Sequence, residues 1–394
     1  MKRILFCLQT LVRGGVEKEL IVLSKILLKN NYEVTLAILY DSNNEMVNEF
    51  RKIGVAILNL DIDREYYCGG NKQMFIKRII RGHLWEAMLF AFKHLFNIGC
   101  SEANININNM QSINIEYDYA VCYHIHSPIM IKYVLNKTKA KQKIAWIHND
   151  FVTTGYRVDR MVKYLMQYSM IVSVSQQVQN EFLELCPGLE SKAKVIHNIL
   201  DIEDIQQKSL EPIADDRFKI NGDISILTIG RLTEQKGIDI AIEACSKLIA
   251  KGYKVVWFVI GDGECFDFLN EKVRNYNLTK QFVFLGEKIN PYPFLKQCDI
   301  YVQPSRHEGY GLAVAEARIL HKPIISTNFA GALEQLENEK NGLIIKVNDI
   351  DGLVHAVENL LDERKRLQLS ENLMNSVKYD LEIKELLSCF KVSA

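Results

Sequence analysis

The chain has 394 residues, more than one ordinary hydrophobic core accommodates and enough for two α/β domains. Lys and Arg balance Asp and Glu at 48 each, so no overall field attracts nucleic acid, and an anionic ligand must be held by local groups. The nine cysteines are scattered without a CxxC pair, which favours reduced thiols in a cytosolic protein over a disulfide framework or a zinc site.

The first apolar run, Ile4–Leu8, has two interpretations, a signal peptide or a buried strand. The run is short for a signal sequence, and the polar residues Gln9 and Arg13 come soon after it. We therefore predict a buried strand that leads into a glycine turn. No stretch of the sequence approaches the roughly 20 apolar residues of a membrane-spanning helix.

Short apolar runs then alternate with longer amphipathic stretches, which predicts parallel sheets with helices on both faces. The first set of predicted strands is Ile4–Leu8, Val34–Leu39, Ala56–Leu60, Tyr119–Tyr123, Ile144–Ile147, Ile171–Val174 and Val195–Ile196. The second set is Ile224–Ile229, Val255–Ile260, Phe282–Leu285, Ile300–Val302, Pro323–Ser326 and Leu343–Ile345. The predicted helices include Glu17–Leu28, Ser127–Leu135, Ile238–Ala250, Leu353–Leu361 and Leu381–Val392. This alternation predicts two α/β units, with a boundary near His197–Asp216.

The segment Lys72–Phe96 differs from the rest because basic residues are interspersed among Met, Phe, Ile, Leu and Trp. One interpretation is an amphipathic helical region that lies on an anionic membrane surface. The other is a helix pair that packs on the first sheet with its basic residues in solvent. The pattern leaves both open.

Two glycine turns follow predicted strands, where ligands of open α/β sheets bind. At Gly14 and Gly15 the backbone can approach a ligand and the next helix offers free N–H groups to an anion, although a plain turn explains the pair equally well. In Gly230–Gly237, Arg231 and Lys236 could grip a diphosphate and neutralise a departing negative charge. Alternatively, both are ordinary surface cations.

A third turn carries the most informative combination of residues. Glu308 precedes a predicted helix, and the backbone N–H groups of Gly309, Tyr310 and Gly311 could meet hydroxyls or phosphate. Glu316 lies further along the helix among alanines, and we expect it to reach outward, where a carboxylate can accept from two vicinal ribose hydroxyls. In the alternative, the Glu308 carboxylate only interacts favourably with the positive end of the helix dipole, and Glu316 is solvated.

His148 comes directly after the predicted strand Ile144–Ile147, at the edge where ligands bind. It could hydrogen-bond a ligand hydroxyl or position reacting groups, although a lone histidine is more often structural. The nearby Asp150 would orient His148 or cap the next helix.

Together these turns resemble the retaining GT-B glycosyltransferases of family four. The spacing of Glu308 and Glu316 is similar to that family's E-x7-E pattern, and Gly230–Gly237 resembles its G-R-L-x-x-x-K-G turn. Gly14-Gly15-Val16-Glu17 is similar to its G-G-x-E. Further similar segments are Gly261–Gly263, Phe284–Gly286, Gly331–Glu334, Asn341–Leu343 and His197–Asp201. The chain departs from the family where Ala330 stands in place of a glycine.

The resemblance implies a GT-B fold, in which two Rossmann-like domains have parallel sheets facing across an interdomain cleft. Residues 1–200 would be the acceptor-side domain and 201–375 the nucleotide-sugar-binding domain. A C-terminal helix in 376–394 would cross back to the N-terminal domain.

The resemblance also implies roles for the residues at these turns. The implied catalytic residues are His148, Arg231, Lys236 and Glu308. The implied substrate-binding residues are Gly14, Gly15, Gly230, Gly286, Glu287, Gly309, Tyr310, Gly311 and Glu316. The cations would bind the donor diphosphate, Glu316 the ribose, and Glu308 with His148 the donor sugar.

The expected activity is retaining transfer of a sugar from a nucleotide diphosphate sugar, UDP-linked or GDP-linked, to a glycan acceptor that is lipid-linked. We expect no metal and no cofactor. Asp61-Ile62-Asp63 resembles the D-x-D of the other glycosyltransferase fold by chance, and His124 and His126 lack an evident third ligand. A sugar-nucleotide epimerase and a non-catalytic nucleotide-sugar binder remain the alternatives.

Overall fold

The computed structural model of the chain describes residues 1–11, 14–40, 45–60, 107–108, 110–125, 127–149, 151, 158–219, 223–374 and 380–390. The segment 72–96, Asp61–Asp63, His126 and Asp150 lie outside the described residues. Within the described part, no helix has both the length and the apolar character that crossing a bilayer requires.

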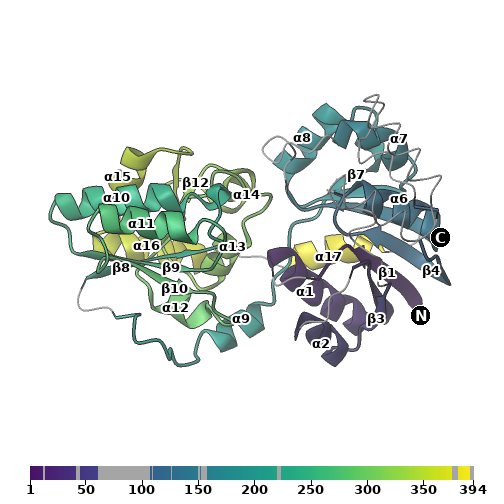
Figure 1. Cartoon of the computed structure of the whole chain (residues 1–394), viewed down its shortest axis with the longest axis horizontal. Coiled ribbons are helices and arrows are strands. Elements are labelled where there is room, and N and C mark those ends of the chain that lie inside the picture. The colour runs from purple at the N-terminus through teal and green to yellow at the C-terminus, as the bar shows by residue number, and fades with distance from the viewer. Residues whose placement is uncertain are drawn as a thin grey trace, which may run out of the picture. The chain divides into compact units, whose positions relative to one another are not determined.

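The described residues form two compact units (Figure 1). The first unit comprises Met1–Ser173, Gln179–Ile196 and Ile383–Ala394, and the second comprises Val174–Val178 and His197–Glu382. Each unit contains a parallel sheet, which confirms the two-domain α/β fold class. The strand orders are β3-β2-β1-β4-β5-β6-β7 and β10-β9-β8-β11-β12-β13.

The first unit has the predicted alternation of strands and helices. Its strands are β1 (Lys2–Leu8), β2 (Tyr32–Ile38), β3 (Ala56–Asn59), β4 (Ile113–Cys122), β5 (Thr138–Ile147), β6 (Met170–Ser173) and β7 (Ala193–Val195). Its α-helices are α1 (Gly15–Lys29), α2 (Glu45–Lys52), α6 (Pro128–Lys137) and α7 (Val162–Leu165). Helix α8 (Gln176–Leu185) begins among the second unit's residues 174–178 and continues in the first. The buried ends of the central strands are apolar because helices cover both faces of a parallel sheet.

The last helix, α17 (Asp380–Cys389), ends beside the first sheet (Figure 1). The ring of Phe390 lies 5.3 Å from that of Tyr119 on β4, and its carbonyl accepts hydrogen bonds from Lys2 and Tyr32 at 3.1 Å each. Phe390 is fully buried, so residues from the two ends of the chain share one core.

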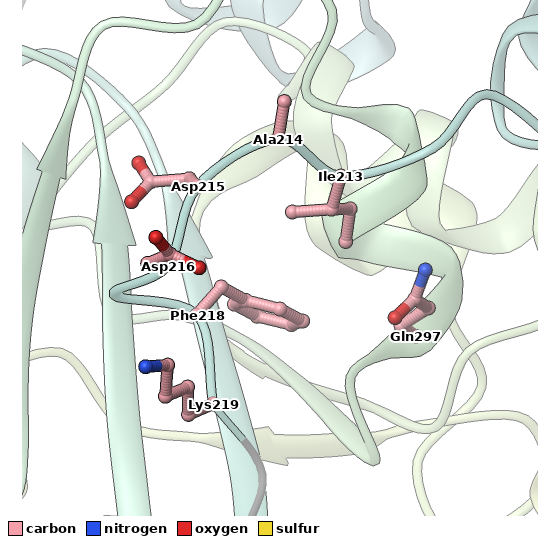
Figure 2. A pocket seen from close by; sticks show the side chains of 7 residues that line it. All are labelled: Ile213, Ala214, Asp215, Asp216, Phe218, Lys219 and Gln297. Atoms are coloured by element: carbon pink, nitrogen blue, oxygen red, sulfur yellow. The ribbon is translucent and has the colours of Figure 1, made fainter.

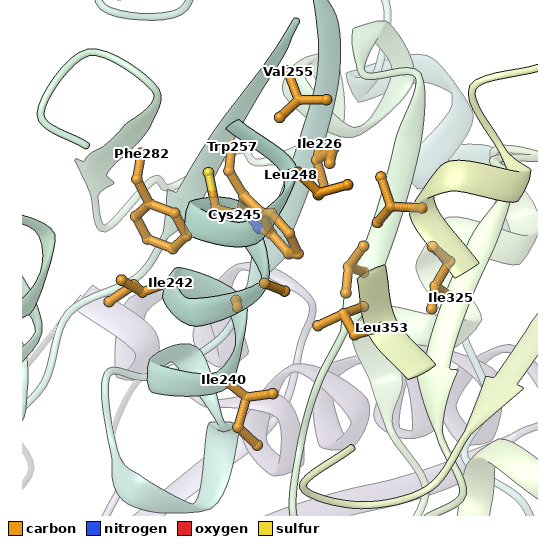
Figure 3. Packing of buried hydrophobic residues seen from close by; sticks show 14 of the residues in the cluster. Ile226, Ile240, Ile242, Cys245, Leu248, Val255, Trp257, Phe282, Ile325 and Leu353 are labelled. Atoms are coloured by element: carbon orange, nitrogen blue, oxygen red, sulfur yellow. The ribbon is translucent and has the colours of Figure 1, made fainter. Parts of the chain in front are cut away.

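The second unit has strands β8 (Ile224–Ile229), β9 (Val255–Ile260), β10 (Phe282–Gly286), β11 (Ile300–Gln303), β12 (Ile324–Thr327) and β13 (Leu343–Ile345). Its α-helices are α9 (Ile202–Lys208), α10 (Ile238–Ala250), α11 (Phe266–Asn275), α12 (Tyr292–Gln297), α13 (Leu312–Ile319), α14 (Ala330–Gln335), α15 (Ile350–Asn359) and α16 (Glu363–Met374). Figure 3 shows α10 packed over the sheet, with Leu248 beside Trp257 and Ile242 on the side of Phe282. The Trp257 indole donates to Thr228 Oγ1 at 3.0 Å, so its polar atom is satisfied inside the core.

Several elements begin earlier than predicted, because their first residues include polar ones. Strand β4 begins at Ile113 rather than Tyr119, and β5 at Thr138 rather than Ile144. The early part of each strand is partly exposed and polar, so an apolar run marks only the buried part. Helix α15 starts at Ile350 because the Asp349 side chain accepts from the Gly352 N–H and caps the helix.

Candidate functional site

The turn after β8 packs directly against the loop after β11. Gly237 has φ +64°, and a Cβ at this position would overlap the carbonyl oxygen of Pro304, so only glycine fits the approach. Gly230 is covered by the stem of Lys236, whose Cδ would lie 3.2 Å from a Cβ at Gly230. The two glycines thereby bring the Lys236 side chain across the turn toward the β11 loop.

Lys236 and Glu308, predicted from two separate turns, meet in the structure. Lys236 Nζ lies 2.9 Å from Glu308 Oε2, and the two side chains are only 14% and 13% exposed. The other oxygen of Glu308 accepts from Gln303 Nε2 at 2.9 Å and from Ser305 Oγ at 2.7 Å. Three donors therefore fix the carboxylate beside a sheltered ammonium.

Arg231 differs from Lys236 because its side chain is exposed. Among the described residues, none forms an ion pair with its guanidinium. The predicted pair of cations thus consists of one sheltered lysine and one solvent-accessible arginine.

A second ion pair, which the sequence did not predict, joins the same two segments. Arg306 donates to both carboxylate oxygens of Asp239, at 2.9 and 2.7 Å, and Gln235 Nε2 donates to the His307 carbonyl at 2.9 Å. Burial raises the pKa of Asp239, but the hydrogen bonds and the positive charge of Arg306, together with the charge of Lys272, lower that pKa by more. The bidentate pair holds the β11 loop against the start of α10.

The glycine turn before α13 is packed from behind. Gly309, Tyr310 and Gly311 are buried, Gly311 has φ +84°, and a Cβ there would lie 2.7 Å from the Phe329 ring. The Tyr310 carbonyl accepts from Gln335 Nε2 at 2.6 Å, which fixes the turn to α14. The predicted hydroxyl-binding backbone is therefore held by contacts with Phe329 and Gln335.

Glu316 does not reach outward as expected. The residue is 7% exposed on α13, and its Oε1 accepts from the Tyr292 hydroxyl at 3.1 Å. Burial and the neighbouring Glu316 carboxylate raise the pKa of Tyr292, so the hydroxyl keeps its proton and donates. Glu316 is buried because α9 and α12 cover this side of α13.

The loop after β10 contains the remaining predicted residues of the second unit. Gly286 has φ +72° and ends the strand, and Glu287 is exposed. Lys288 pairs with Asp215 at 2.7 Å, and Arg217 donates to the carbonyls of Phe284 and Leu285. The chain segment before β8 therefore holds the end of β10 in place.

A cavity of about 490 Å³ lies beside that segment (Figure 2). Its walls are Ile213, Ala214, Asp215, Asp216, Phe218, Lys219 and Gln297. None of these is a predicted site residue.

His148 lies in the first unit at the end of β5, together with the glycine turn. Gly14 is the N-cap of α1 and Gly15 its first residue. The His148 ring packs 4.4 Å from the ring of Tyr123 and parallel to Trp146 within 9°. Its Nδ1 lies 3.5 Å from Glu19 Oε2, a partner that the sequence did not predict. A charged residue on the apolar face of α1, next to Leu20 and Leu23, was the available signal.

In the described ranges, no group of three His, Cys, Asp or Glu side chains is arranged to hold a metal ion. His124 lies near His148, with ring centroids 6.4 Å apart, and burial lowers its pKa. The seven described cysteines are free thiols, and all but Cys265 are buried.

Comparisons with known proteins agree with this architecture. Residues 211–376 match the family profile of glycosyl transferases group 1. The capsular polysaccharide biosynthesis glycosyltransferase CapM of Staphylococcus aureus is 25% identical over 240 residues, 56% of this chain and 63% of that protein. The N-acetylgalactosamine-N,N'-diacetylbacillosaminyl-diphospho-undecaprenol 4-alpha-N-acetylgalactosaminyltransferase of Campylobacter jejuni is 27% identical over 183 residues, 46% and 47% of the two chains. The matched part of this chain thus spans 63% of CapM and 47% of the Campylobacter protein.

A solved structure with the same arrangement of elements is that of Anabaena HepE in complex with UDP and glucose. It superimposes with a TM-score of 0.72 over 99% of this chain and 98% of HepE, at 16% sequence identity. The chain therefore has the GT-B fold of two parallel-sheet α/β units.

Proposed function

We propose that the chain is a retaining glycosyltransferase that moves a sugar from a nucleotide diphosphate sugar to a glycan acceptor without a metal ion. The observation that carries the proposal is the 2.9 Å pairing of Lys236 with Glu308 beside the buried glycine turn. This cluster offers a cation for a diphosphate and a carboxylate for sugar hydroxyls. The family match of 211–376 includes all of these residues and supports the assignment.

Arg231 and Lys236 would bind the donor pyrophosphate, Glu308 the sugar and Glu316 the ribose. Gly230, Gly286 and Glu287 would lie along the nucleotide, and the N–H groups of Gly309, Tyr310 and Gly311 along the sugar. In the first unit, Gly14 and Gly15 would approach the phosphate or acceptor, and His148 the sugar. HepE's binding of UDP and glucose favours a UDP-sugar, with a GDP-sugar as the alternative donor.

The proposed reaction is attack on one face of the sugar. The bond from the anomeric carbon to the phosphate oxygen breaks, and its electrons stay on the phosphate. The acceptor oxygen bonds to the anomeric carbon on the same face, and its proton passes to the departing phosphate oxygen. Lys236, already held by Glu308, and the exposed Arg231 would stabilise the charge of the leaving group.

The proposed acceptor is a lipid-linked glycan used in bacterial surface polysaccharide synthesis, at the cytoplasmic face of the membrane. The Campylobacter relative, named for a diphospho-undecaprenol substrate, and the capsular relative support this class. The basic and apolar composition of 72–96 supports contact with an anionic membrane surface. If the purified chain ignores anionic vesicles, the membrane contact is wrong.

The donor is identified by thermal stability with UDP-, GDP- and ADP-sugars. A ligand at about 100 times its dissociation constant adds roughly 2.7 kcal/mol to the free energy of unfolding. A stabilising sugar nucleotide is then tested for transfer to membrane glycolipid extracts. Formation of its epimer without an acceptor would identify an epimerase, and binding without any turnover would identify a non-catalytic binder.

Lys236→Ala should lower the rate of sugar transfer about a hundredfold, because one preorganised group at the leaving phosphate contributes on the order of 3 kcal/mol. The matched control is Lys247→Ala on the same stretch of chain, since Lys247 pairs with Asp351 on the surface. Initial rates of nucleoside diphosphate release measure both variants. Near-wild-type turnover by Lys236→Ala refutes its assignment.

A further inference from the structure

A buried carboxyl group faces the histidine of the first unit. The side chains of Glu19 and His148 are 4% and 1% exposed, and Glu19 Oε2 lies 3.5 Å from His148 Nδ1. The rings of Tyr123 and Trp146 pack against the imidazole and hold its plane, and Nδ1 is the ring nitrogen on the carboxyl side. The other ring nitrogen, Nε2, is then the atom that the proposed sugar contact would use.

The protonation state of Glu19 determines what Nε2 can do. A neutral imidazole has one N–H, and its position depends on what the other nitrogen meets. A protonated carboxyl group donates to Nδ1, so the ring hydrogen resides on Nε2. An ionised carboxylate instead accepts from Nδ1–H, and Nε2 becomes a hydrogen-bond acceptor.

The surroundings favour the protonated carboxyl group at neutral pH. Burial raises the pKa of Glu19 to about 8, while the Tyr123 hydroxyl acts in the opposite direction. Glu17 on the same helix adds negative charge close to Tyr123. His124, on the segment after β4, has a pKa lowered by burial and is neutral at pH 7.

We propose that Glu19 is a positioning residue, which donates a hydrogen bond to His148 Nδ1 and so keeps a hydrogen on Nε2 for donation to an oxygen of the sugar nucleotide. The inference rests on the proposed function, which assigns His148 its substrate contact. No proton is lost in this state. Ionisation of Glu19 releases its proton to solvent, and the ring hydrogen moves from Nε2 to Nδ1 by exchange with water.

Two variants of Glu19 test the inference. Glu19→Gln keeps the shape and can donate from its amide, but it cannot ionise, whereas Glu19→Ala removes the donor. The position of the ring hydrogen is measured from the ¹⁵N shifts of labelled histidine, with the His148 signals assigned by His148→Gln. We expect Nε2–H in the wild type at pH 7, a change to Nδ1–H as pH rises through about 8, and Nε2–H at every pH from 7 to 9 in Glu19→Gln.

Sugar transfer gives the second readout. With a midpoint of about 8, the wild-type rate should be about tenfold lower at pH 9 than at pH 7, because about a tenth of Glu19 is then protonated. Glu19→Gln should keep its pH 7 rate at pH 9. Glu19→Ala should lose about tenfold at pH 7, which corresponds to one hydrogen bond.

A control and two contrary results complete the test. Glu33→Gln, which removes an exposed carboxyl group of the first unit, should show the wild-type pH profile. If Glu19→Gln also shows the wild-type pH profile, or if the tautomer of His148 is the same in the wild type and both Glu19 variants at every pH, the inference is wrong. If the wild type turns over no sugar nucleotide, the proposed function fails, and the NMR result, which needs no turnover, still decides whether Glu19 directs His148.

Discussion

Glu308 and Glu316 flank one glycine turn, yet the structure holds them in different ways. Glu308 accepts from Lys236, Gln303 and Ser305, so a sugar hydroxyl has to compete for a carboxylate that is already bonded. Glu316 is more deeply buried and takes its orientation from Tyr292. The Tyr292 hydroxyl should therefore influence the grip on the ribose without touching the ligand.

Tyr292→Phe should raise the KM for the sugar nucleotide about fivefold and change kcat little. The variant removes one hydrogen bond, on the order of 1 kcal/mol, from the group proposed to hold the ribose in both ground and transition states. Steady-state kinetics measure the split. Tyr276→Phe, at an exposed position after α11, is the control and should leave both constants unchanged. A fall in kcat with constant KM would contradict this role.

Single residues were predicted only where a turn marked them. Lys236 and Glu308 stand next to glycines after strands, a place that sequence shows, and the structure brings them together. Glu19 and Tyr292 stand on helices, where their contacts depend on how the helix packs. No spacing in the sequence reveals such a contact, and for the same reason Glu316 was wrongly expected to point outward.

At the scale of elements, the turn after β8 and the loop after β11 are joined by several contacts. The close approach at Gly237, the Arg306–Asp239 pair and the Lys236–Glu308 pair all join the same two segments. The strands of the second unit were predicted nearly to the residue because each contains a short apolar run and no charged residue. The contacts between the loops that follow these strands were not predicted, because they join residues that are far apart in the sequence.

Gly237→Ala should destabilise the second unit more than Gly252→Ala does. Both glycines have positive φ, +64° and +85°, which costs about 1–2 kcal/mol for an L-residue. Only at Gly237 would the new Cβ overlap a backbone atom, that of Pro304, which adds about 1–3 kcal/mol. Native-state hydrogen exchange of the β8 and β9 amides measures the difference. Equal losses for the two variants would show that the contact yields at little cost.

At the scale of the whole molecule, the two compact units are not two halves of the sequence. The chain leaves the first unit at 173, re-enters it at 179, leaves again at 196 and re-enters at 383. The alternation of strands and helices predicted two units. It did not predict that residues 174–178 belong to the second unit, because nothing in their composition distinguishes them from their neighbours.

Phe390→Ala should destabilise the first unit by about 3–5 kcal/mol and leave the second almost unchanged. The ring is fully buried against Tyr119, and its loss leaves a cavity in that core. Hydrogen exchange of the β1 and β4 amides should accelerate, while that of β8 and β9 should not. Met374→Ala, at an exposed position, is the control. Equal acceleration in both sheets would show that the units unfold together.

The placement of Phe390 has a consequence for synthesis on the ribosome. The strands of the first sheet are made before most of the second unit, but the aromatic side chain that completes their core is made only after all of it. At about 5–20 residues per second, translation of the intervening stretch takes on the order of ten seconds or more. During that interval the nascent first unit has an open apolar site beside Tyr119, and chaperones that bind exposed apolar surface would recognise this site until Phe390 is made.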